Sequence, residues 1–242
     1  MSGNDSFIVG RNSVLEALKS DTEINYLICS SKVSKEISNL ACKKKIPIKH
    51  CDFRKLDSMF KSTNHQGLAA QVSPRRYSSI DEILELSRIK KEPSFIVILD
   101  QIQDPHNFGA ISRTAECMGV HGVVIGKRRC ICVNSTVEKC ACGALQYLKI
   151  ARVDNLSKSC GYLKSKGLWI CGADMSGRNF NNFSDLFSGP VALVIGSEGR
   201  GISKGLKDQC DVLASIPMFG KINSLNASVA AGIFIQKISQ FR

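Results

Sequence analysis

The sequence lacks the features that mark a protein for a membrane or for export. Its 242 residues contain no apolar run that approaches the roughly 20 residues a helix needs to cross a bilayer. The segment Met1–Ser6 has neither the basic-then-apolar order of a signal peptide nor the arginine-rich pattern of a transit peptide. We therefore expect a cytoplasmic protein.

Two common nucleotide-binding motifs are missing as well. The chain contains neither the GxGxxG pattern of dinucleotide-binding folds nor the Gly-Lys-Ser/Thr of phosphate-binding NTPase loops, and Gly196–Gly201 has a different glycine spacing. A dinucleotide-dependent enzyme and an NTPase are therefore both disfavoured. The simplest role of these glycines is tight turns, although a backbone without Cβ also lets a ligand approach closely.

The cysteines do not have the pattern of a disulfide framework or of a zinc site. There are 11 of them, an odd number in a chain without an export signal, so we expect reduced thiols. The pairs Cys130/Cys132 and Cys140/Cys142 are separated by one residue, whereas paired zinc ligands are usually separated by two to four. We expect no metal, and a thiol or metal protein remains an alternative.

Basic residues outnumber acidic ones. The chain carries 33 Lys and Arg against 21 Asp and Glu, a net charge of +12. Residues 1–80 hold 13 basic and 7 acidic residues, so this first third is about twice as basic per residue as the rest. A basic surface of this kind favours a polyanionic partner, because cation–phosphate contacts release counterions, but a solvated basic surface is the simpler alternative.

The alternation of apolar and amphipathic segments predicts an α/β protein. A small α/β domain is expected over residues 1–73, a linker over 74–93 and a second domain over 94–242. The linker begins with a stretch that contains Pro, Ser and Arg, and it includes a short helix over 80–88. In the second domain strands alternate with helices, which predicts a parallel sheet with helices on both faces.

Three polar blocks follow apolar runs in this second domain. They cover Asp104–Glu116, Leu193–Ser203 and Ile216–Gly232, and their most distinctive polar residues are Asn107, Arg113, Glu198, Ser224 and Asn226. Loops at the carboxyl ends of parallel strands are where α/β proteins build their sites. Each residue also has a simpler role: a helix N-cap for Asn107, Ser224 or Asn226, and a solvated charge for Arg113 or Glu198.

The order and content of these blocks resemble the three motifs of the SpoU (TrmH) branch of the knotted SPOUT RNA methyltransferases. Within it the chain is most similar to the RlmB group, on Ile8–Leu18 and His65–Ala70 as well as the three blocks. The resemblance covers the whole chain. It implies a small ribosomal-protein-like RNA-binding domain followed by a trefoil-knotted catalytic domain. It also implies a homodimer that uses S-adenosylmethionine to methylate a guanosine 2′-hydroxyl in the P loop of 23S ribosomal RNA.

The same resemblance assigns roles to individual residues. The implied catalytic residues are Asn107, Arg113, Glu198, Ser224 and Asn226. The implied cofactor-binding residues are Ala173, Gly196, Ile216, Met218, Ser224 and Leu225. The candidate RNA-binding residues are Arg11, Lys43, Lys44, Lys45, Arg75 and Arg76.

A free guanidinium stays protonated, so we expect Arg113 to clamp a phosphate and polarise the hydroxyl rather than to act as a base. A transfer-RNA 2′-O-methyltransferase and a non-catalytic RNA-binding or ribosome-assembly protein remain alternatives.

Overall fold

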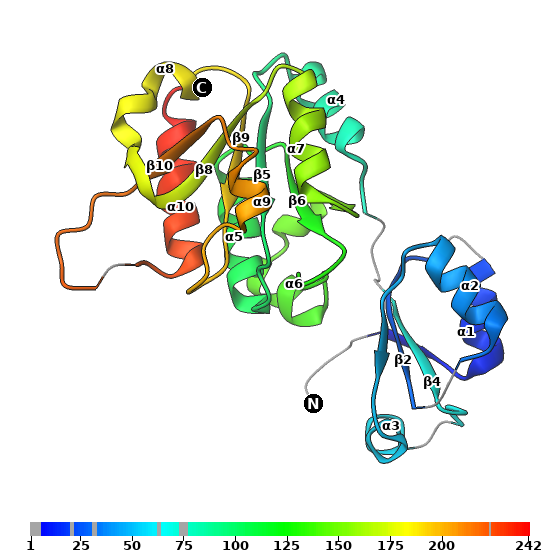
Figure 1. The fold of residues 1–242 in the computed structure, drawn as a ribbon. Helices are drawn as coiled ribbons and strands as arrows, with labels where there is room; N and C mark the ends of the chain where they lie inside the picture. The colour runs from blue at the N-terminus through cyan, green and yellow to red at the C-terminus, as the bar shows by residue number, and fades with distance from the viewer. Residues whose placement is uncertain (1–5, 20–21, 31–32, 62–63, 73–76, 223) are drawn as a thin grey trace. The chain divides into compact units, whose positions relative to one another are not determined.

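The computed structural model describes residues 6–19, 22–30, 33–61, 64–72, 77–222 and 224–242. They form two compact units that divide near Tyr77 (Figure 1). Each unit combines a sheet with packed helices, so the α/β class expected from the sequence is confirmed. No helix within these residues is long and apolar enough to span a bilayer.

The first unit is a four-stranded sheet of order β1-β4-β2-β3. β4 is antiparallel to both of its neighbours, and β3 is parallel to β2. The helices bury one face each, because Val14 and Leu18, and likewise Ile37 and Ala41, lie one helical turn apart and enter the same core. The elements are β1 (Ser6–Val9), α1 (Arg11–Lys19), β2 (Ile24–Cys29), α2 (Lys35–Lys43), β3 (Ile48–His50), α3 (Phe53–Met59) and β4 (Leu68–Val72).

The second unit is built on a six-stranded sheet of order β10-β8-β9-β5-β6-β7, in which all neighbouring strands run parallel. The central strands β5 and β9 are buried throughout, which explains their unbroken apolar sequences. The strands are β5 (Phe95–Leu99), β6 (Gly122–Gly126), β7 (Lys149–Val153), β8 (Trp169–Asn179), β9 (Val191–Ile195) and β10 (Val212–Ser215).

Helices cover both faces of this sheet, as predicted (Figure 1). On one face Ile83 of α4, Leu163 of α7 and Leu206 of α9 share a core with the strands. On the other, α5 and α10 pack against each other and against the sheet. The helical segments are α4 (Ile80–Lys90), α5 (Pro105–Cys117), α6 (Ser135–Ala141), η1 (Ala144–Gln146), α7 (Leu156–Ser165), η2 (Phe180–Phe183), α8 (Ser184–Phe187), α9 (Lys204–Lys207) and α10 (Ala227–Ser239).

The structure changes the extent of the linker. The short helix predicted over 80–88 is α4, but it is part of the second unit and not of a linker, because its Ile83 and Leu84 are buried in the core of that unit. Ser79 caps this helix in a reciprocal capping box with Glu82. Ser78 is tied to the sheet too, because its N–H donates to the carbonyl oxygen of Ile150 at 2.7 Å. The second unit therefore begins well before residue 94.

Candidate active site

The carboxyl ends of three neighbouring strands lie at one level in the second unit. Ile195 at the end of β9 is in register with Leu99 of β5 on one side and with Ala173 of β8 on the other. From β5 the sheet continues to β6 and β7, and from β9 it continues to β8 and β10, so the strand order reverses between β5 and β9. Such a switch point is where open α/β sheets bind their ligands.

Asp100 joins the loops that leave β5 and β9. It is 4 % exposed. Its N–H donates to the carbonyl oxygen of Ile195 at 2.8 Å, and its Oδ2 accepts from the N–H of Ser203 at 2.7 Å. A buried carboxylate bonded in this way fixes the start of one loop against the end of the other. The sequence analysis missed Asp100, although its position directly after an apolar strand was the available signal.

The three polar blocks meet in one cluster of Asn107, Glu198 and Asn226. Oε1 of Glu198 accepts from Asn107 Nδ2 at 3.2 Å, from the N–H of Ala227 at 3.3 Å and from Asn226 Nδ2. Asn226 Nδ2 also donates to Oδ1 of Asn107 at 3.0 Å. The cluster thus joins the first turn of α5, the loop after β9 and the start of α10.

Of the residues considered as helix caps, only Asn226 has that role; Asn107 and Ser224 do not cap a helix. Asp104 caps α5 by accepting from the N–H of His106 at 3.0 Å, which leaves Asn107 inside the helix and 6 % exposed. Asn226, and not Ser224, caps α10, since its Oδ1 accepts from the N–H groups of Ser228 and Val229. Ser224 lies instead in the wall of a neighbouring cavity.

Arg113 is not part of the cluster. It lies six residues after Asn107, about 240° further round an ideal helix, on an exposed part of α5. Its Nη1 donates to Sγ of Cys142 at 3.5 Å, and Cys140 Sγ lies 3.3 Å from Nδ1 of His106. The second Cys-x-Cys pair therefore contacts polar side chains of α5. Within the described residues, no group of three or more His, Cys, Asp or Glu side chains could hold a metal ion.

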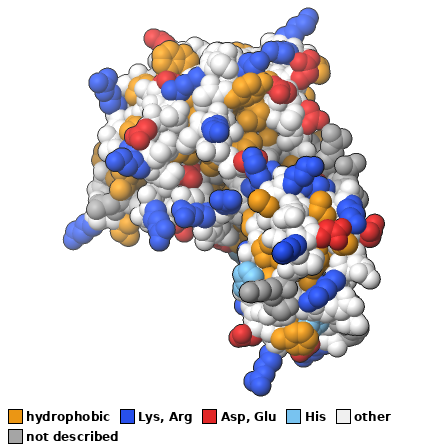
Figure 2. Space-filling model, turned by 45° about the vertical axis from the view of Figure 1, so that its right-hand side comes forward, with side chains coloured by type: hydrophobic (Ala, Val, Ile, Leu, Met, Phe, Trp, Pro, Cys, Tyr) orange, Lys and Arg blue, Asp and Glu red, His pale blue; other side chains and the backbone are white. Residues whose placement is uncertain are grey.

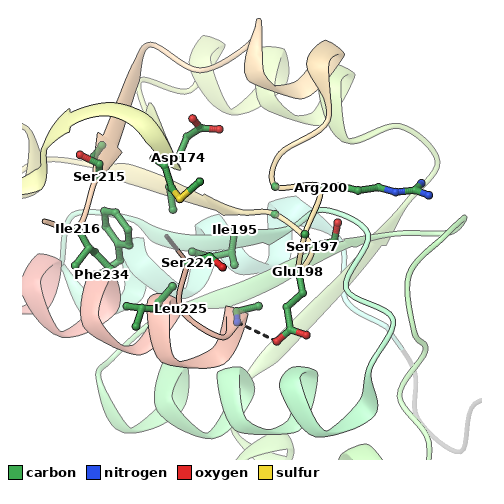
Figure 3. Close-up of a pocket in the computed structure, with 18 of the residues that line it drawn as sticks. Asp174, Ile195, Ser197, Glu198, Arg200, Ser215, Ile216, Ser224, Leu225 and Phe234 are labelled. Atoms are coloured by element: carbon green, nitrogen blue, oxygen red, sulfur yellow. Dashed lines mark hydrogen bonds between the residues drawn. The ribbon is translucent and has the colours of Figure 1, made fainter. Parts of the chain in front are cut away.

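A cavity of about 310 Å³ lies beside the cluster, and we call it the first cavity (Figure 3). It is within the size range of small-molecule pockets. Most of its wall is apolar and includes Ile195 and Phe234, and Glu198 reaches it from the cluster. Its lining contains every residue that the sequence analysis associates with the cofactor, namely Ala173, Gly196, Ile216, Met218, Ser224 and Leu225.

The glycines after β9 make the tight loop at the edge of this cavity. A Cβ on Gly196 would lie 2.1 Å from the carbonyl carbon of Gly201, so no other residue fits there without displacing the backbone. Ser197 and Gly201 exchange two backbone hydrogen bonds of 3.1 and 2.9 Å, and Gly201 has a φ of +63°. The glycines therefore let the loop turn tightly at the edge of the cavity, which Ser197, Glu198 and Arg200 also line.

Asp174 adds a negative charge to the wall of the first cavity. Burial opposes ionisation of its carboxyl, but hydrogen bonds from Ser176 and Lys207 outweigh that effect and lower its pKa. Its Oδ1 accepts from the N–H of Ser176 at 2.9 Å and from Nζ of Lys207 at 2.9 Å. The sequence analysis did not select Asp174, although it follows the apolar start of β8.

The candidate RNA-binding residues are only partly described. In the first unit Lys43, Lys44 and Lys45 are exposed at the end of α2. Arg11 is exposed at the start of α1, and its Nε donates to the carbonyl oxygen of Gln66 at 3.2 Å. Arg75 and Arg76 lie outside the described residues. Figure 2 shows Lys and Arg side chains spread over the visible surface of both units, without a single dominant patch.

Comparisons with known proteins match both units. The SpoU rRNA Methylase family model matches residues 94–236, and the model for RNA 2′-O ribose methyltransferase substrate binding matches residues 7–78. A putative TrmH family tRNA/rRNA methyltransferase, YacO of Bacillus subtilis, is 40% identical over 247 residues, which cover 100% of this chain and 98% of that protein. A putative TrmH family tRNA/rRNA methyltransferase of Staphylococcus haemolyticus is 40% identical and covers 98% of this chain and 96% of its own.

Solved structures show the same fold. The SpoU methyltransferase AviRb from Streptomyces viridochromogenes, solved in complex with AdoMet, has a TM-score of 0.61 at 22% identity and covers 97% of this chain and 89% of its own. A TrmH/SpoU tRNA modifying enzyme of A. aeolicus has a TM-score of 0.57 at 26% identity, covering 67% of this chain and 85% of its own. The architecture expected from the motifs is therefore confirmed, whereas the roles of individual residues stay predictions.

Proposed function

The chain belongs to the SpoU rRNA methylase family and is an S-adenosylmethionine-dependent RNA methyltransferase; we propose that its acceptor is the 2′-hydroxyl of a guanosine in the P loop of 23S ribosomal RNA. The observation that carries this proposal is the meeting of Asn107, Glu198 and Asn226 beside the first cavity. Three loops, up to 119 residues apart, supply a preorganised polar cluster next to a largely apolar pocket.

The first cavity suits S-adenosylmethionine. Its apolar wall, with Ile195, Leu225 and Phe234, offers packing surface to an adenine ring, and the carboxylates of Asp174 and Glu198 offer charge to a cationic ligand. Gly196 lines this cavity, and its lack of a Cβ lets the backbone of Gly201 pack against it, which fixes the loop at the cavity edge. When bound, this cofactor supplies an electrophilic methyl group on a positively charged sulfur.

The polar cluster positions the acceptor in this proposal. Three N–H groups hold Oε1 of Glu198, and Asn107 is fixed by hydrogen bonds at both its amide nitrogen and its amide oxygen. Groups held in this way lose little entropy when they orient a ribose, which is how a positioned site accelerates a displacement reaction. The oxygen Oε2 of Glu198 remains to accept from a ribose hydroxyl.

Arg113 acts on phosphate rather than as a base in this account. Its guanidinium stays protonated, and its exposed place on α5 leaves donors to reach an RNA phosphate. The hydroxyl proton then leaves through phosphate or water. The exposed lysines at the end of α2 contribute to RNA binding in the first unit, whose match to a substrate-binding model supports that role.

The remaining parts of the proposal are a homodimer that acts in the cytoplasm and requires no metal. A second candidate function is methylation of transfer RNA, because the names of the relatives include both tRNA and rRNA. A non-catalytic RNA-binding role would leave the preorganised cluster beside the cavity without a purpose.

The test offers purified protein and labelled S-adenosylmethionine to large-subunit ribosomal RNA and to transfer RNA, each from a strain without this enzyme. The RNA is then digested to nucleosides. Label in 2′-O-methylguanosine from ribosomal RNA is the expected result. Label confined to transfer RNA would move the function to the second candidate, and no label in either RNA or in subunit precursors would overturn the proposal.

A further inference from the structure

A second cavity of about 370 Å³ lies beside the first. Its wall comes from two loops, the one that leaves β5 and the one that leaves β9. The lining residues are Gln101, Ile102, Gln103, Asp104, Asn107, Ser197, Glu198 and Arg200. Ser197, Glu198 and Arg200 line both cavities, so a ligand in one lies next to a ligand in the other.

The two cavities differ in chemistry. The first has a largely apolar wall, whereas the wall of the second is mostly amide, carboxylate and guanidinium groups. In Figure 3 the side chain of Arg200 points away from the apolar residues of the first cavity. In the described part of the chain its guanidinium makes no hydrogen bond or ion pair. An unengaged guanidinium beside a polar cavity suits a phosphate group, which it can bind with two N–H donors.

The backbone at the entrance of this cavity is held in a strained conformation. Gln101 has a φ of +59°, the left-handed region that residues with a Cβ rarely adopt. The bonds of Asp100 fix the preceding residue, and the N–H of Ile131 donates to the carbonyl oxygen of Ile102 at 2.8 Å on the following side. Strain that its surroundings impose in this way is typical of ligand sites.

We propose that the second cavity receives the acceptor nucleotide of the RNA, with Arg200 bound to a phosphate next to the acceptor ribose. This inference rests on the proposed function. It places the ribose beside Glu198, which faces both cavities, and so between the cofactor and the guanidinium. Arg200 is then a residue that positions RNA, and Gln103 lines the same cavity.

The test compares Arg200→Ala with Arg88→Ala. Arg88 pairs with Glu85 near the end of α4, which leads to the amino end of β5 and therefore lies at the opposite edge of the sheet. Both substitutions remove one exposed cation. For Arg200→Ala we expect the KM for RNA to rise on the order of tenfold, with a much smaller effect on the Kd for S-adenosylmethionine, because the side chain points away from the apolar residues of the first cavity. The slope of log RNA affinity against log salt should fall by about 0.7.

Gln103→Glu is a second variant, which adds a negative charge to the same cavity without changing its volume. We expect it to raise the KM for RNA while cofactor affinity is retained, and Arg88→Ala to change neither. The inference is wrong if Arg200→Ala keeps the normal KM and salt slope, or if it weakens cofactor binding as much as RNA binding. If the unmodified protein transfers no methyl group to any RNA, the proposed function itself fails, which is a different outcome.

Discussion

Asn226 donates its amide N–H to Oδ1 of Asn107 at 3.0 Å, across 119 residues of chain. The same nitrogen donates to Glu198, and the oxygen of the same side chain caps α10. One residue therefore fixes the start of the last helix and the geometry of the polar cluster together. Substitutions at Asn226 can separate these two functions.

Asn226→Asp should keep the cap and destroy the cluster. The new carboxylate can still accept from the first N–H groups of α10, but it replaces the donor that faces Glu198 by a like charge. We expect methyl transfer to fall by at least about 100-fold, with little change in the melting temperature. Asn155→Asp is the matched control, because Asn155 caps α7 in the same way beside the edge strand β7. Equal losses of activity in both variants would contradict the role of the cluster.

Gly196→Ala should damage both stability and cofactor binding. The added Cβ would meet the backbone of Gly201 at 2.1 Å, so the loop has to move, at a cost of about 1–3 kcal/mol. Gly161→Ala in α7 is the control, since its Cβ would meet nothing within 4 Å and should stabilise the helix by roughly 0.5–1 kcal/mol. Denaturant unfolding followed by Trp169, the one tryptophan of the chain, reports on the second unit. A Gly196→Ala protein with normal stability and cofactor affinity would show that the loop is not tight.

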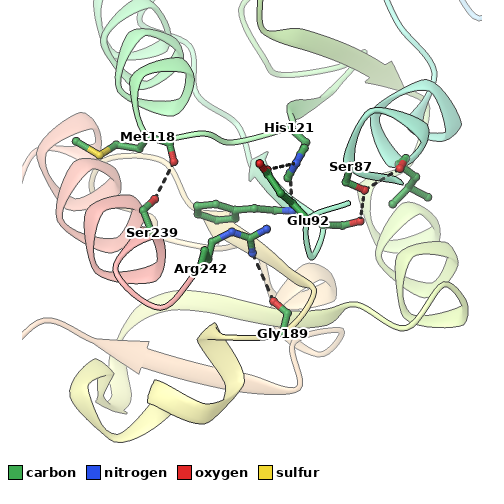
Figure 4. Close-up of polar contacts among 10 residues, drawn as sticks. Ser87, Glu92, Met118, His121, Gly189, Ser239 and Arg242 are labelled. Carbon is green, nitrogen blue, oxygen red and sulfur yellow. Dashed lines mark hydrogen bonds and ion pairs between the residues drawn. The ribbon is translucent and has the colours of Figure 1, made fainter. Parts of the chain in front are cut away.

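His121 has a buried ring with polar contacts at both nitrogens (Figure 4), and it should make the second unit less stable at mildly acidic pH. Its Nδ1 accepts from the N–H of Phe95 at 3.0 Å, and its Nε2 faces Glu92 at 3.1 Å. Burial, Arg242 and Lys90 lower its pKa from the ordinary 6.5 and outweigh the opposing effect of Glu92. The unfolded chain thus binds this proton more readily than the folded one, and the stability that His121 contributes is lost as pH falls below the unfolded value.

Unfolding of wild type and His121→Gln at about pH 7.5 and about pH 5.5 checks this expectation. The free energy of unfolding of the wild type should drop more between these conditions than that of the variant. The same drop in both proteins would mean that other groups control the acid sensitivity.

The cysteines should differ sharply in reactivity. Burial raises the pKa of Cys160 and of Cys171 to about 12, so these thiols should resist alkylation at neutral pH, whereas Cys142 and Cys117 are exposed. Modification of Cys142 should also displace Arg113 and slow methyl transfer. Mass spectrometry identifies the modified thiols. On alkylation, the Cys142→Ser protein should keep its methyl-transfer activity and the Cys117→Ser protein should lose it. Inactivation of both variants at the wild-type rate would rule out a role for the contact between Cys142 and Arg113.

Local sequence was sufficient to predict the elements that frame the site. The buried runs of β5 and β9 and the glycine-rich loop after β9 have strong local signals, and family motifs identified Asn107, Glu198 and Asn226. Local sequence was not sufficient to predict which side chains bond to one another. Asp104 followed by Pro105 is a local signal for the cap of α5, whereas the bonds of Asn107 to residues 91 and 119 positions away follow only from the register of the sheet.

Arg113 and the predicted linker also show that local sequence does not determine which parts of the chain pack together. The motif groups Arg113 with Asn107, but a separation of six residues turns it to another part of α5, where Cys142 happens to lie. The sequence of α4 predicts a helix, but it does not show that Ile83 and Leu84 complete the core of the second unit. Arg200 has no local signal beyond its place in a loop, and only the structure shows that it lines the second cavity.

The most direct test of the account is single-turnover methyl transfer by Asn107→Ala, with the affinity for S-adenosylmethionine measured on the same preparation. Asn107 contributes to the cluster and to the second cavity but does not line the first. The account predicts cofactor affinity close to that of the wild type and a rate of transfer to RNA lower by at least about 100-fold. A normal rate of transfer would contradict the claim that this cluster is the active site.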